Sequence, residues 1–394
     1  MRFKRLAAVA IGAALAFSFA ACGSGNSTPT DTGATTPTDT SAPATTTAPA
    51  INYATDVGIV LPTNSESRWP VAYAEFNKVM PGAKVLYSNN DPATEANNVQ
   101  QMITNKVKVL IICPFDATAA AAEVDQAAAA GIKVISYDRL IMNTKNVSYY
   151  ATFDSVAVGT AQAQYLIDQA GSTQGNNLYI YTGAATDNNA FLFFQGAWAV
   201  LQPKIADGTF VIRNSSQAVS VQGDATLTHD QEAAIIGQTT INWDPTTAQN
   251  LAQGNLANAT PDQLGTVYLL TPNDDTARPI GDAFRANTNV TTVFTTGQDF
   301  TQASLQYILD GKQSMTVWKP DSQLVAACQN IVDFVLSGAT SGQPSSIVTS
   351  YNNGAADIPS TKGDLTIVTK DNVTDTVNNS GLYTISNGTV NPVS

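Results

Sequence analysis

The sequence predicts an α/β protein of two lobes, each a doubly wound parallel sheet covered by helices on both faces. Three observations predict this fold class. The strand-like segments are short, continuous apolar runs such as VKVLIIC at 107–113, which is typical of strands buried on both faces. Each run is followed by a helix-like segment of ordinary length, as in a parallel sheet. The runs are too many for one comfortable sheet, so two sheets are expected.

Strand and helix signals alternate through the first predicted lobe. TDVGIVLP is an apolar run that ends in proline, and WPVAYAEFNKVM after it has the pattern of an amphipathic helix. ATAAAAEVDQAAAA is rich in alanine, the best helix former. Strands are expected here at 55–62, 83–88, 107–113, 132–137 and 148–153. Helices are expected at 69–80, 93–104 and 117–130.

The same alternation continues in the second predicted lobe, which begins with a helix-like segment at 156–170. Further strands are expected at 177–183, 209–214, 267–272, 291–297 and 314–320. Further helices are expected at 191–201, 246–257, 280–284, 303–309 and 324–338. The segment between 214 and 246 is polar and has no predicted element, and the tail at 346–370 is expected to be irregular with short strands.

The N-terminus has the three parts of an export signal. MRFKR is basic, LAAVAIGAALAFSFA is apolar but too short to span a bilayer comfortably, and FAAC ends in Cys22. This resembles a bacterial lipoprotein signal over residues 1–21, after which the new N-terminal cysteine is diacylated. Two acyl chains suffice for stable anchoring. We therefore expect a secreted protein that is lipid-anchored to the outer face of the bacterial cell membrane. An ordinary secreted protein with a stray cysteine is the alternative.

Residues 22–50 contain no large apolar side chain after Cys22. A stretch of this composition cannot bury enough surface to offset the entropy of ordering, so it is expected to be a disordered, Thr/Pro-rich tether. The folded chain should therefore begin near residue 51. We assign 51–154 plus 320–350 to an N-terminal lobe, and 155–319 plus 351–394 to a C-terminal lobe.

Composition limits the partners and the chemistry. The formal net charge of −12 argues against nucleic acid or anionic lipid as a binding partner. Cys113 and Cys328 lie in apolar segments and are expected to be buried thiols, although export would permit a disulfide. His229 is the one histidine, which rules out a multi-histidine metal site and weakens a catalytic triad. Because the common nucleotide, metal and hydrolase motifs are missing as well, we expect no cofactor, no metal and no catalysis.

Polar clusters follow the predicted strands at the point where each strand ends. The first, third and fourth strands are followed by SESRW, CPFD and YDR, and later strands by TGAATDNN, TPNDD, TTGQD and WKPD. Any one cluster could be only a helix cap, but all occupy the same kind of position. In doubly wound sheets, ligands bind beyond the carboxyl ends of the strands. The charges that follow GIKVISY could be a surface ion pair, yet their position favours a ligand site.

These segments carry a resemblance to a known family. SESRW, GIKVISYDRLI with VSYYATFD, TDNNAFLFFQGA, NWDPTTAQ, TPNDDTA, TTGQD, MTVWKPD and NNGAADIPS occur in this order, with similar spacing, in the xylose-binding and multiple-sugar-binding proteins of bacterial ABC importers. From residue 51 onward the chain resembles these type I periplasmic binding proteins. The resemblance implies two lobes joined by a three-strand hinge, which close around a ligand.

The resemblance also implies the partners. They are a monosaccharide, either a pentose or a hexose of the xylose, glucose, galactose, arabinose or fructose class, and the ABC permease of the importer. The membrane is contacted through the lipid anchor only, and a monomer is expected.

The residues that match the family's binding positions suit a sugar, which has apolar ring faces and a rim of hydroxyls that both donate and accept. Asp138 and Arg139 match the pair that grips vicinal hydroxyls. Arg68 matches a hydroxyl contact, and Trp69 matches an aromatic wall. The remaining matches are Asp187, Asn189, Asn273, Asp299 and Lys319, with Trp243 as a second aromatic wall.

Some of these positions have plainer interpretations that stay open. Trp69 could be core on an amphipathic helix, and Trp243 follows a loosely aligned stretch. Asp187 could be only a helix cap, and Asn188 rather than Asn189 could be the contact.

Two further positions are ambiguous in the same way. Lys319 could be a solvated residue at a strand end. Arg278–Pro279 stands where the family usually has small residues, which bears on ligand size and on the lip of the cleft.

Two other functions also remain open. A signalling receptor of the same fold could bind a different small polyol, such as a furanosyl autoinducer, and pass it to a sensor. An anchored glycosidase would use two carboxylates. We expect binding rather than catalysis, because the candidate carboxylates all match binding positions. A sugar-responsive repressor is excluded by the export signal and by the lack of a DNA-binding head.

Overall fold

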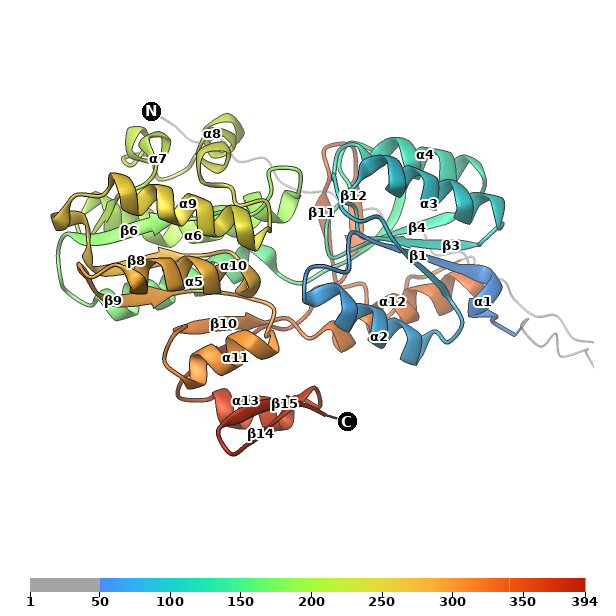
Figure 1. Ribbon diagram of the computed structural model, residues 1–394. Coiled ribbons are helices and arrows are strands. Elements are labelled where there is room, and N and C mark those ends of the chain that lie inside the picture. Colours follow the sequence, from blue (N-terminus) through green and yellow to red (C-terminus); the bar gives the residue numbers. More distant parts are fainter. Residues whose placement is uncertain (1–49, 340, 394) are drawn as a thin grey trace, which may run out of the picture. The chain divides into compact units, whose positions relative to one another are not determined.

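The computed structural model describes residues 50–339 and 341–393. The predicted signal peptide at 1–21, Cys22 and all of the tether except residue 50 lie outside the described residues. The described chain contains two large sheets whose strands are mostly parallel, each in its own lobe (Figure 1). The predicted α/β fold class with two doubly wound lobes is confirmed.

The first lobe is built on a sheet of order β11-β12-β5-β4-β3-β1-β2. Its strands are β1 (Val57–Leu61), β2 (Lys84–Tyr87), β3 (Val109–Ile112), β4 (Lys133–Tyr137), β5 (Val147–Ala151), β11 (Thr349–Asn352) and β12 (Asp357–Ser360). Helices α1 (Tyr53–Asp56), α2 (Arg68–Val79) and α12 (Asp321–Leu336) lie on one face, and α3 (Pro92–Thr104) and α4 (Ala120–Ala129) on the other.

Alternation along the strands explains why helices cover both faces of this sheet. In β1, Val57, Ile59 and Leu61 pack in the core shared with α2 and α12, whereas Val60 packs in the core shared with α3 and α4. Successive side chains of a strand point to opposite faces, so a continuous apolar run needs cover on each.

The second lobe repeats this plan on a smaller sheet of order β7-β6-β8-β9. Its strands are β6 (Asn176–Ile180), β7 (Phe210–Ile212), β8 (Gly265–Leu270) and β9 (Val290–Thr295). One face is covered by α5 (Ser155–Ala170) and α6 (Asn188–Ala206), and the other by α9 (Pro245–Asn258) and α10 (Asp274–Ala286). The short 3₁₀ helix η1 (Pro261–Gln263) precedes β8.

The polar segment without a predicted element contains two helices, α7 (Ser216–Ser220) and α8 (His229–Thr239). A capping box starts α8: the Thr228 side chain accepts from the Gln231 backbone, and the Gln231 side chain accepts from the Thr228 backbone. Most of α8 is polar, so the apolar periodicity that reveals a helix is weak here, but the Thr-x-x-Gln spacing was a usable signal.

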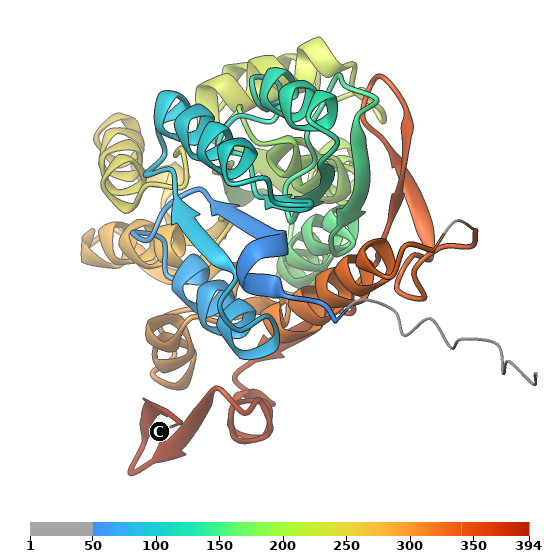
Figure 2. The same ribbon diagram turned by 90° about the vertical axis from the view of Figure 1, so that its right-hand side faces the viewer.

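The C-terminal segment packs beside the second lobe. Strands β10 (Met315–Trp318) and β13 (Thr366–Thr369) form an antiparallel pair. Helices α11 (Gln302–Leu309) and α13 (Val373–Asn379) share a small core with the hairpin of β14 (Tyr383–Ser386) and β15 (Thr389–Pro392), and Figure 2 shows this hairpin beside α13. The chain passes between the lobes three times: between β5 and α5, between β10 and α12, and between β12 and β13.

One boundary differs from the prediction. The tail at 346–370 was expected to be irregular with short strands, and 351–394 was assigned to the C-terminal lobe. Instead β11 and β12 form a hairpin in the first sheet, where Ser360 pairs with Tyr150 of β5. Ile358 is fully buried there. Apart from Ile358 and Ser360, the strand residues of the hairpin are half-buried or exposed, so the hairpin is mostly polar and its strand signal was weak.

One further sequence expectation can be compared with the described residues. Cys113 and Cys328 are both buried and unpaired, so the expected free thiols are confirmed. Within residues 50–339 and 341–393, every helix is too short or too polar to cross a bilayer.

Candidate functional site

The carboxyl ends of both sheets face one cavity between the lobes. The free space left among its side chains is only about 20 Å³, room for about one water molecule, so the lobes nearly fill it. All ten residues predicted to bind ligand line it. Its full lining is Glu66, Arg68, Trp69, Asp138, Arg139, Asp187, Asn189, Phe193, Trp243, Asn273, Gln298, Asp299 and Lys319.

A sharp turn after β4 aims Asp138 into the cavity. Asp138 has a φ of +59°, and the Arg139 N–H donates to the Tyr137 carbonyl at 2.6 Å, which gives a three-residue γ-turn. This left-handed conformation is strained for most residues and easiest for Gly, Asn and Asp. Hydrogen bonds to the Asp138 carbonyl, from the Tyr150 hydroxyl at 2.7 Å and from Asn189 Nδ2 at 3.0 Å, hold the turn in place.

Arg68 is the centre of a buried charge network. Its Nη2 lies 2.7 Å from Asp138 Oδ1, and its Nη1 lies 3.1 Å from Asp299 Oδ1 in the other lobe. Asp321 Oδ1 is 3.3 Å from Nη2. Lys319 Nζ lies 3.8 Å from Asp138 Oδ1 and 3.6 Å from Asp299 Oδ1. The cavity therefore presents guanidinium, ammonium and carboxylate groups close together.

The charges in this network shift the pKa values of Arg68 and Asp138. Burial works to lower the pKa of Arg68, but the nearby carboxylates, Asp138 foremost, outweigh it and raise that pKa well above its ordinary value. Burial works to raise the pKa of Asp138, but the charges of Arg68 and Lys319 outweigh it and lower that pKa. Both side chains are therefore ionised at neutral pH.

Arg139 joins the lobes through a second ion pair. Its Nε lies 3.0 Å from Asp187 Oδ2 at the start of α6, and its Nη2 lies 3.6 Å from Glu66 Oε2. Asp138 and Arg139 are only 6% and 3% exposed, so they are not a surface ion pair. Asp187 also caps α6, because its Oδ1 accepts the Asn189 N–H at 2.9 Å. The helix-cap interpretation of Asp187 is therefore correct, and Asp187 also lines the cavity.

Trp69 is both a core residue and a wall of the cavity. It is 1% exposed within the core of the first lobe, and its Nε1 donates to Glu66 Oε2 at 2.8 Å. The guanidinium carbons of Arg68 and Arg139 each lie 5.3 Å from its ring centroid. The tryptophan thus orients the two arginines through cation–π contacts.

Trp243 lines the other side, next to Phe193. Their rings are 6.3 Å apart and nearly perpendicular, at 81°. Trp243 has a φ of +58°, which is unusual for a bulky side chain. Gly183 permits the ring position, because a Cβ there would lie 2.0 Å from Trp243 Cζ2. Lys319 Nζ lies 5.6 Å from the Phe193 ring centroid.

Three buried polar atoms in this cavity have no hydrogen-bond partner among the described residues: Arg68 Nε, Trp243 Nε1 and Gln298 Oε1. A buried polar atom without a partner is costly. Two of the three are donors and one is an acceptor, so they suit a neutral ligand whose groups both donate and accept. The amide of Asn189, in contrast, is engaged with the protein at both ends, by Asp138 and by the Ser155 hydroxyl.

Sequence reasoning missed three lining residues. Glu66 and Gln298 lie inside the segments SESRW and TTGQD and were passed over in favour of their neighbours. Phe193 follows Asn189 by four positions on α6, which puts both on the same helix face. That spacing was a usable signal, but a phenylalanine in the apolar run FLFF is indistinguishable from a core residue.

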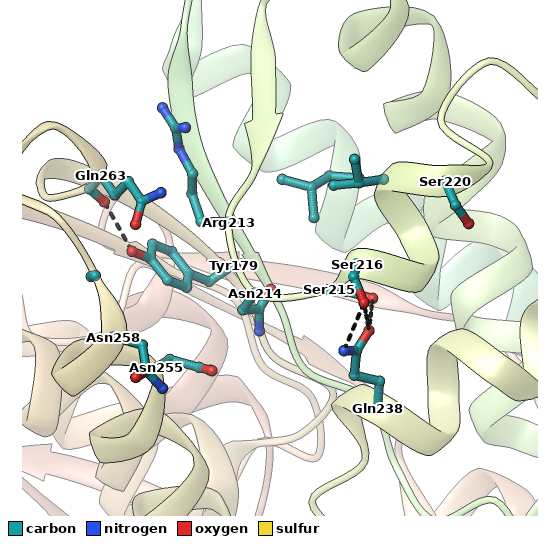
Figure 3. Close-up of a pocket in the computed structure, with 13 residues that line it drawn as sticks. Tyr179, Arg213, Asn214, Ser215, Ser216, Ser220, Gln238, Asn255, Asn258 and Gln263 are labelled. Carbon is teal, nitrogen blue, oxygen red and sulfur yellow. Dashed lines mark hydrogen bonds between the residues drawn. The ribbon is translucent and has the colours of Figure 1, made fainter.

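A larger hollow, of about 570 Å³, lies on the second lobe between β7, α7 and α9 (Figure 3). It contains none of the predicted residues, and its polar groups largely satisfy one another. The Tyr179 hydroxyl donates to the Gln263 carbonyl at 2.9 Å, and Gln238 bonds to Ser215 and Ser216. In the part of the chain that the structure describes, no group of three or more His, Cys, Asp and Glu side chains could hold a metal ion.

Comparisons with known proteins agree with this geometry. Residues 57–340 match the family described as "Periplasmic binding protein domain". The multiple sugar-binding periplasmic receptor ChvE of Rhizobium radiobacter is 32% identical over 316 residues, which cover 77% of this chain and 84% of ChvE. The D-xylose-binding periplasmic protein of Escherichia coli is 32% identical over 304 residues, which cover 77% of this chain and 82% of that protein.

Solved structures give the same result. A carbohydrate transporter solute-binding protein of Chloroflexus aurantiacus, in complex with D-glucose, is 52% identical with a TM-score of 0.81, covering 86% of this chain and 98% of its own. An ABC transporter solute-binding protein of Clostridium phytofermentans, with bound β-D-glucose, is 31% identical with a TM-score of 0.74. The match covers 83% of this chain and 98% of that protein. This chain belongs to the periplasmic binding protein family.

Proposed function

We propose that this protein is the extracellular, lipid-anchored sugar receptor of an ABC importer, which closes two lobes around one monosaccharide and delivers it to the permease. The observation that carries the proposal is the interlobe cavity, where forked charged groups and aromatic rings meet. A sugar needs this combination, because its ring faces are apolar and its vicinal hydroxyls pair with carboxylates and guanidinium groups.

The roles proposed for the residues follow from the contacts. Asp138, Asp299 and Lys319 surround the Arg68 guanidinium and can share a pair of vicinal hydroxyls with it. Arg139, Asp187 and Asn189 hold the opposite side. Asn273 begins α10, and its Oδ1 accepts from the Thr276 hydroxyl, which orients the amide. Trp69 and Trp243 are the proposed walls against the ring faces.

D-glucose is the first candidate ligand. The relative from Chloroflexus aurantiacus, at 52% identity, is described in complex with D-glucose, and the one from Clostridium phytofermentans with β-D-glucose. Xylose remains the second candidate, because it is the same pyranose without the hydroxymethyl group, and two curated relatives are D-xylose-binding proteins. Anchoring through Cys22 rests on the sequence of the signal alone.

The signalling receptor of the same fold stays as the alternative, because the site would serve it equally well. Transport is favoured by the relatives described as ABC transporter solute-binding proteins. Genes for a permease and an ATPase beside this one would support import, and a neighbouring sensor kinase would support signalling. Binding without catalysis is proposed because the relatives are binding proteins and receptors.

Isothermal titration calorimetry tests the proposal. The panel is D-glucose, D-xylose, L-arabinose, D-ribose, D-galactose and D-fructose, with each sugar analysed after incubation. The proposal expects one-to-one binding of at least one sugar, recovered unchanged. No binding by any member would contradict it, and a sugar recovered as a different product would show an enzyme.

A further inference from the structure

Ser67 and Asp275 join the two lobes outside the ligand cavity. The Ser67 N–H donates to Asp275 Oδ2 at 2.9 Å, and the Ser67 hydroxyl donates to Asp275 Oδ1 at 2.9 Å. Ser67 precedes α2 in the first lobe, and Asp275 lies in the first turn of α10 in the second. Neither residue lines the cavity. The contact therefore links the lobes without touching the ligand space.

Helix α2 cannot cap its own N-terminus with side chains. Ser67 occupies the N-cap, where a serine side chain ordinarily accepts from a backbone N–H two or three residues later. The third helical residue is Pro70, which has no N–H and no side-chain acceptor to complete a capping box. Ser67 makes no side-chain cap bond in its own helix. The Trp69 N–H donates to the Glu66 carbonyl at 3.3 Å, whereas the Ser67 N–H at the start of α2 needs an acceptor from outside the helix.

Asp275 supplies that acceptor from the opposite lobe. A carboxylate at a helix N-terminus satisfies an N–H and interacts favourably with the helix dipole. Arg278 holds the carboxylate in place: its Nη2 lies 2.7 Å from Asp275 Oδ1, and its Nη1 donates to the hydroxyls of Ser304 at 2.8 Å and Thr301 at 3.0 Å. Arg278 thereby ties the capping carboxylate to the rest of the second lobe.

We infer that Ser67, Asp275 and Arg278 form an interlobe latch, in which closure of the lobes caps α2 and opening removes the cap. The inference rests on the proposed function, since a latch matters to a ligand held between the lobes. The latch forms only once the lobes have closed. It therefore slows the departure of the ligand and leaves the encounter rate unchanged. Asp275 and Arg278 are positioning residues that act through α2.

Stopped-flow kinetics followed by tryptophan fluorescence test the latch. The probe is D-glucose, or the panel sugar that binds the wild type most tightly. Asp275→Asn and Asp275→Ala should speed dissociation about threefold to thirtyfold, the equivalent of losing a helix cap, with the association rate unchanged. Arg278→Gln should act in the same direction. Asp282→Asn is the matched control, because Asp282 pairs with Arg285 on the same helix and accepts a hydrogen bond from the Tyr307 hydroxyl of α11, away from the first lobe.

A second variant separates a latch from a simple helix cap. Pro70→Gln gives α2 the sequence Ser-x-x-Gln and hence a capping box of its own. The double variant Pro70→Gln/Asp275→Asn should still release sugar fast, although its helix is capped locally. Release at the wild-type rate, in this double variant or in Asp275→Asn alone, would overturn the latch. A wild type that binds no panel sugar would instead overturn the proposed function.

Discussion

Asp138 and Arg139 are consecutive in the chain, yet each forms its ion pair with a different residue. Asp138 pairs with Arg68 of the same lobe, at 2.7 Å, and Arg139 pairs with Asp187 of the other lobe, at 3.0 Å. The turn between them has a positive φ at Asp138 and separates the two side chains. A neighbouring pair of opposite charges therefore takes part in two different networks, each of which also reaches the other lobe.

Substitution of Asp138 tests the first network. Asp138→Ala removes the carboxylate nearest to Arg68, at 2.7 Å, and the acceptor proposed for the ligand hydroxyls, at a cost of roughly 2 to 4 kcal/mol in affinity, or about thirtyfold to a thousandfold. Asp138→Asn is the more specific test, because it keeps the shape of the side chain and one acceptor oxygen while removing the charge. Calorimetry with the sugar panel measures the affinity of both variants. If Asp138→Asn binds every sugar as well as the wild type does, Asp138 does not grip the ligand.

Substitution of Gly183 tests the wall formed by Trp243. A Cβ at Gly183 would lie 2.0 Å from Trp243 Cζ2, so Gly183→Ala must displace the ring. Overpacking of this kind costs about 1–3 kcal/mol, and we expect a loss of affinity between about fivefold and a hundredfold. Calorimetry gives the affinity, and tryptophan fluorescence reports the displaced ring.

Gly237→Ala is the control for this test. Gly237 lies in α8 with open space around its Cβ position, so affinity should be unchanged, and the better helix former should stabilise the fold slightly. Equal affinities for the two alanine variants would show that Trp243 is no part of the ligand wall.

Buried carboxyl groups predict how stability depends on pH. Burial raises the pKa of Glu95 to about 8 from an ordinary 4.5, and raises those of Glu123 and Asp274 to about 7. A carboxyl with a raised pKa binds its proton more readily in the folded state. Between about pH 5 and 8 the folded state therefore holds more protons, and the free energy of unfolding falls as pH rises.

Denaturant titrations at pH 5, 6, 7 and 8 measure this slope. Glu95 is 2% exposed, and its Oε2 accepts the Phe115 N–H at 2.9 Å, a bond that the amide oxygen of glutamine can keep. Glu95→Gln should therefore flatten the slope in the upper part of this range, by up to about 1.4 kcal/mol per pH unit. A wild type whose free energy of unfolding rises between pH 5 and 8 would contradict the prediction.

The layered fold was predictable because its signal is local. Apart from the hairpin of β11 and β12, most strands of the two large sheets are apolar runs, and polar clusters follow them, so the sheets and their ligand-binding edges can be predicted without knowing the packing. Most of the candidate residues meet in one cavity for the same reason, since parallel strands place their carboxyl ends at one edge of a sheet. Lys319 and Trp243 are exceptions, because Lys319 follows β10 of an antiparallel pair and Trp243 follows α8.

The rest of the site depends on contacts that no local pattern encodes. Phe193 turns toward the cavity because of how α6 sits against Trp243, and its sequence context is that of a core residue. Ser67 and Asp275 lie 208 positions apart, in different lobes, yet are joined by a hydrogen bond. The hairpin of β11 and β12 joins the first sheet by pairing with a distant strand, although its own side chains are mostly polar.

Replacement of Cys22 tests the anchor. If Cys22 is diacylated, Cys22→Ser should release the protein into the medium or the soluble fraction, because the acyl chains supply the membrane affinity. Deletion of residues 23–50 should leave sugar affinity nearly unaltered, since every residue that lines the cavity comes later in the chain. Fractionation followed by immunoblotting measures the first, and calorimetry the second. Unchanged membrane association of Cys22→Ser would count against the lipoprotein interpretation.

Ligand-driven closure is the final prediction, and it follows from the side chains that cross the cavity. Arg68 reaches Asp299 at 3.1 Å and Arg139 reaches Asp187 at 3.0 Å, each across the gap between lobes. A sugar that contacts both sides favours the closed state by its difference in affinity for the two states. Small-angle scattering should show a smaller radius of gyration with sugar.

The melting temperature provides an independent measurement of the same closure. At a hundredfold excess of sugar over Kd, binding stabilises the folded state by about 2.7 kcal/mol, and the melting temperature should continue to rise with sugar concentration. The scattering result decides between closure and simple occupancy, because a ligand held by one lobe alone would raise the melting temperature without compaction. Tight binding at a constant radius of gyration would therefore show that the cavity does not close around its ligand.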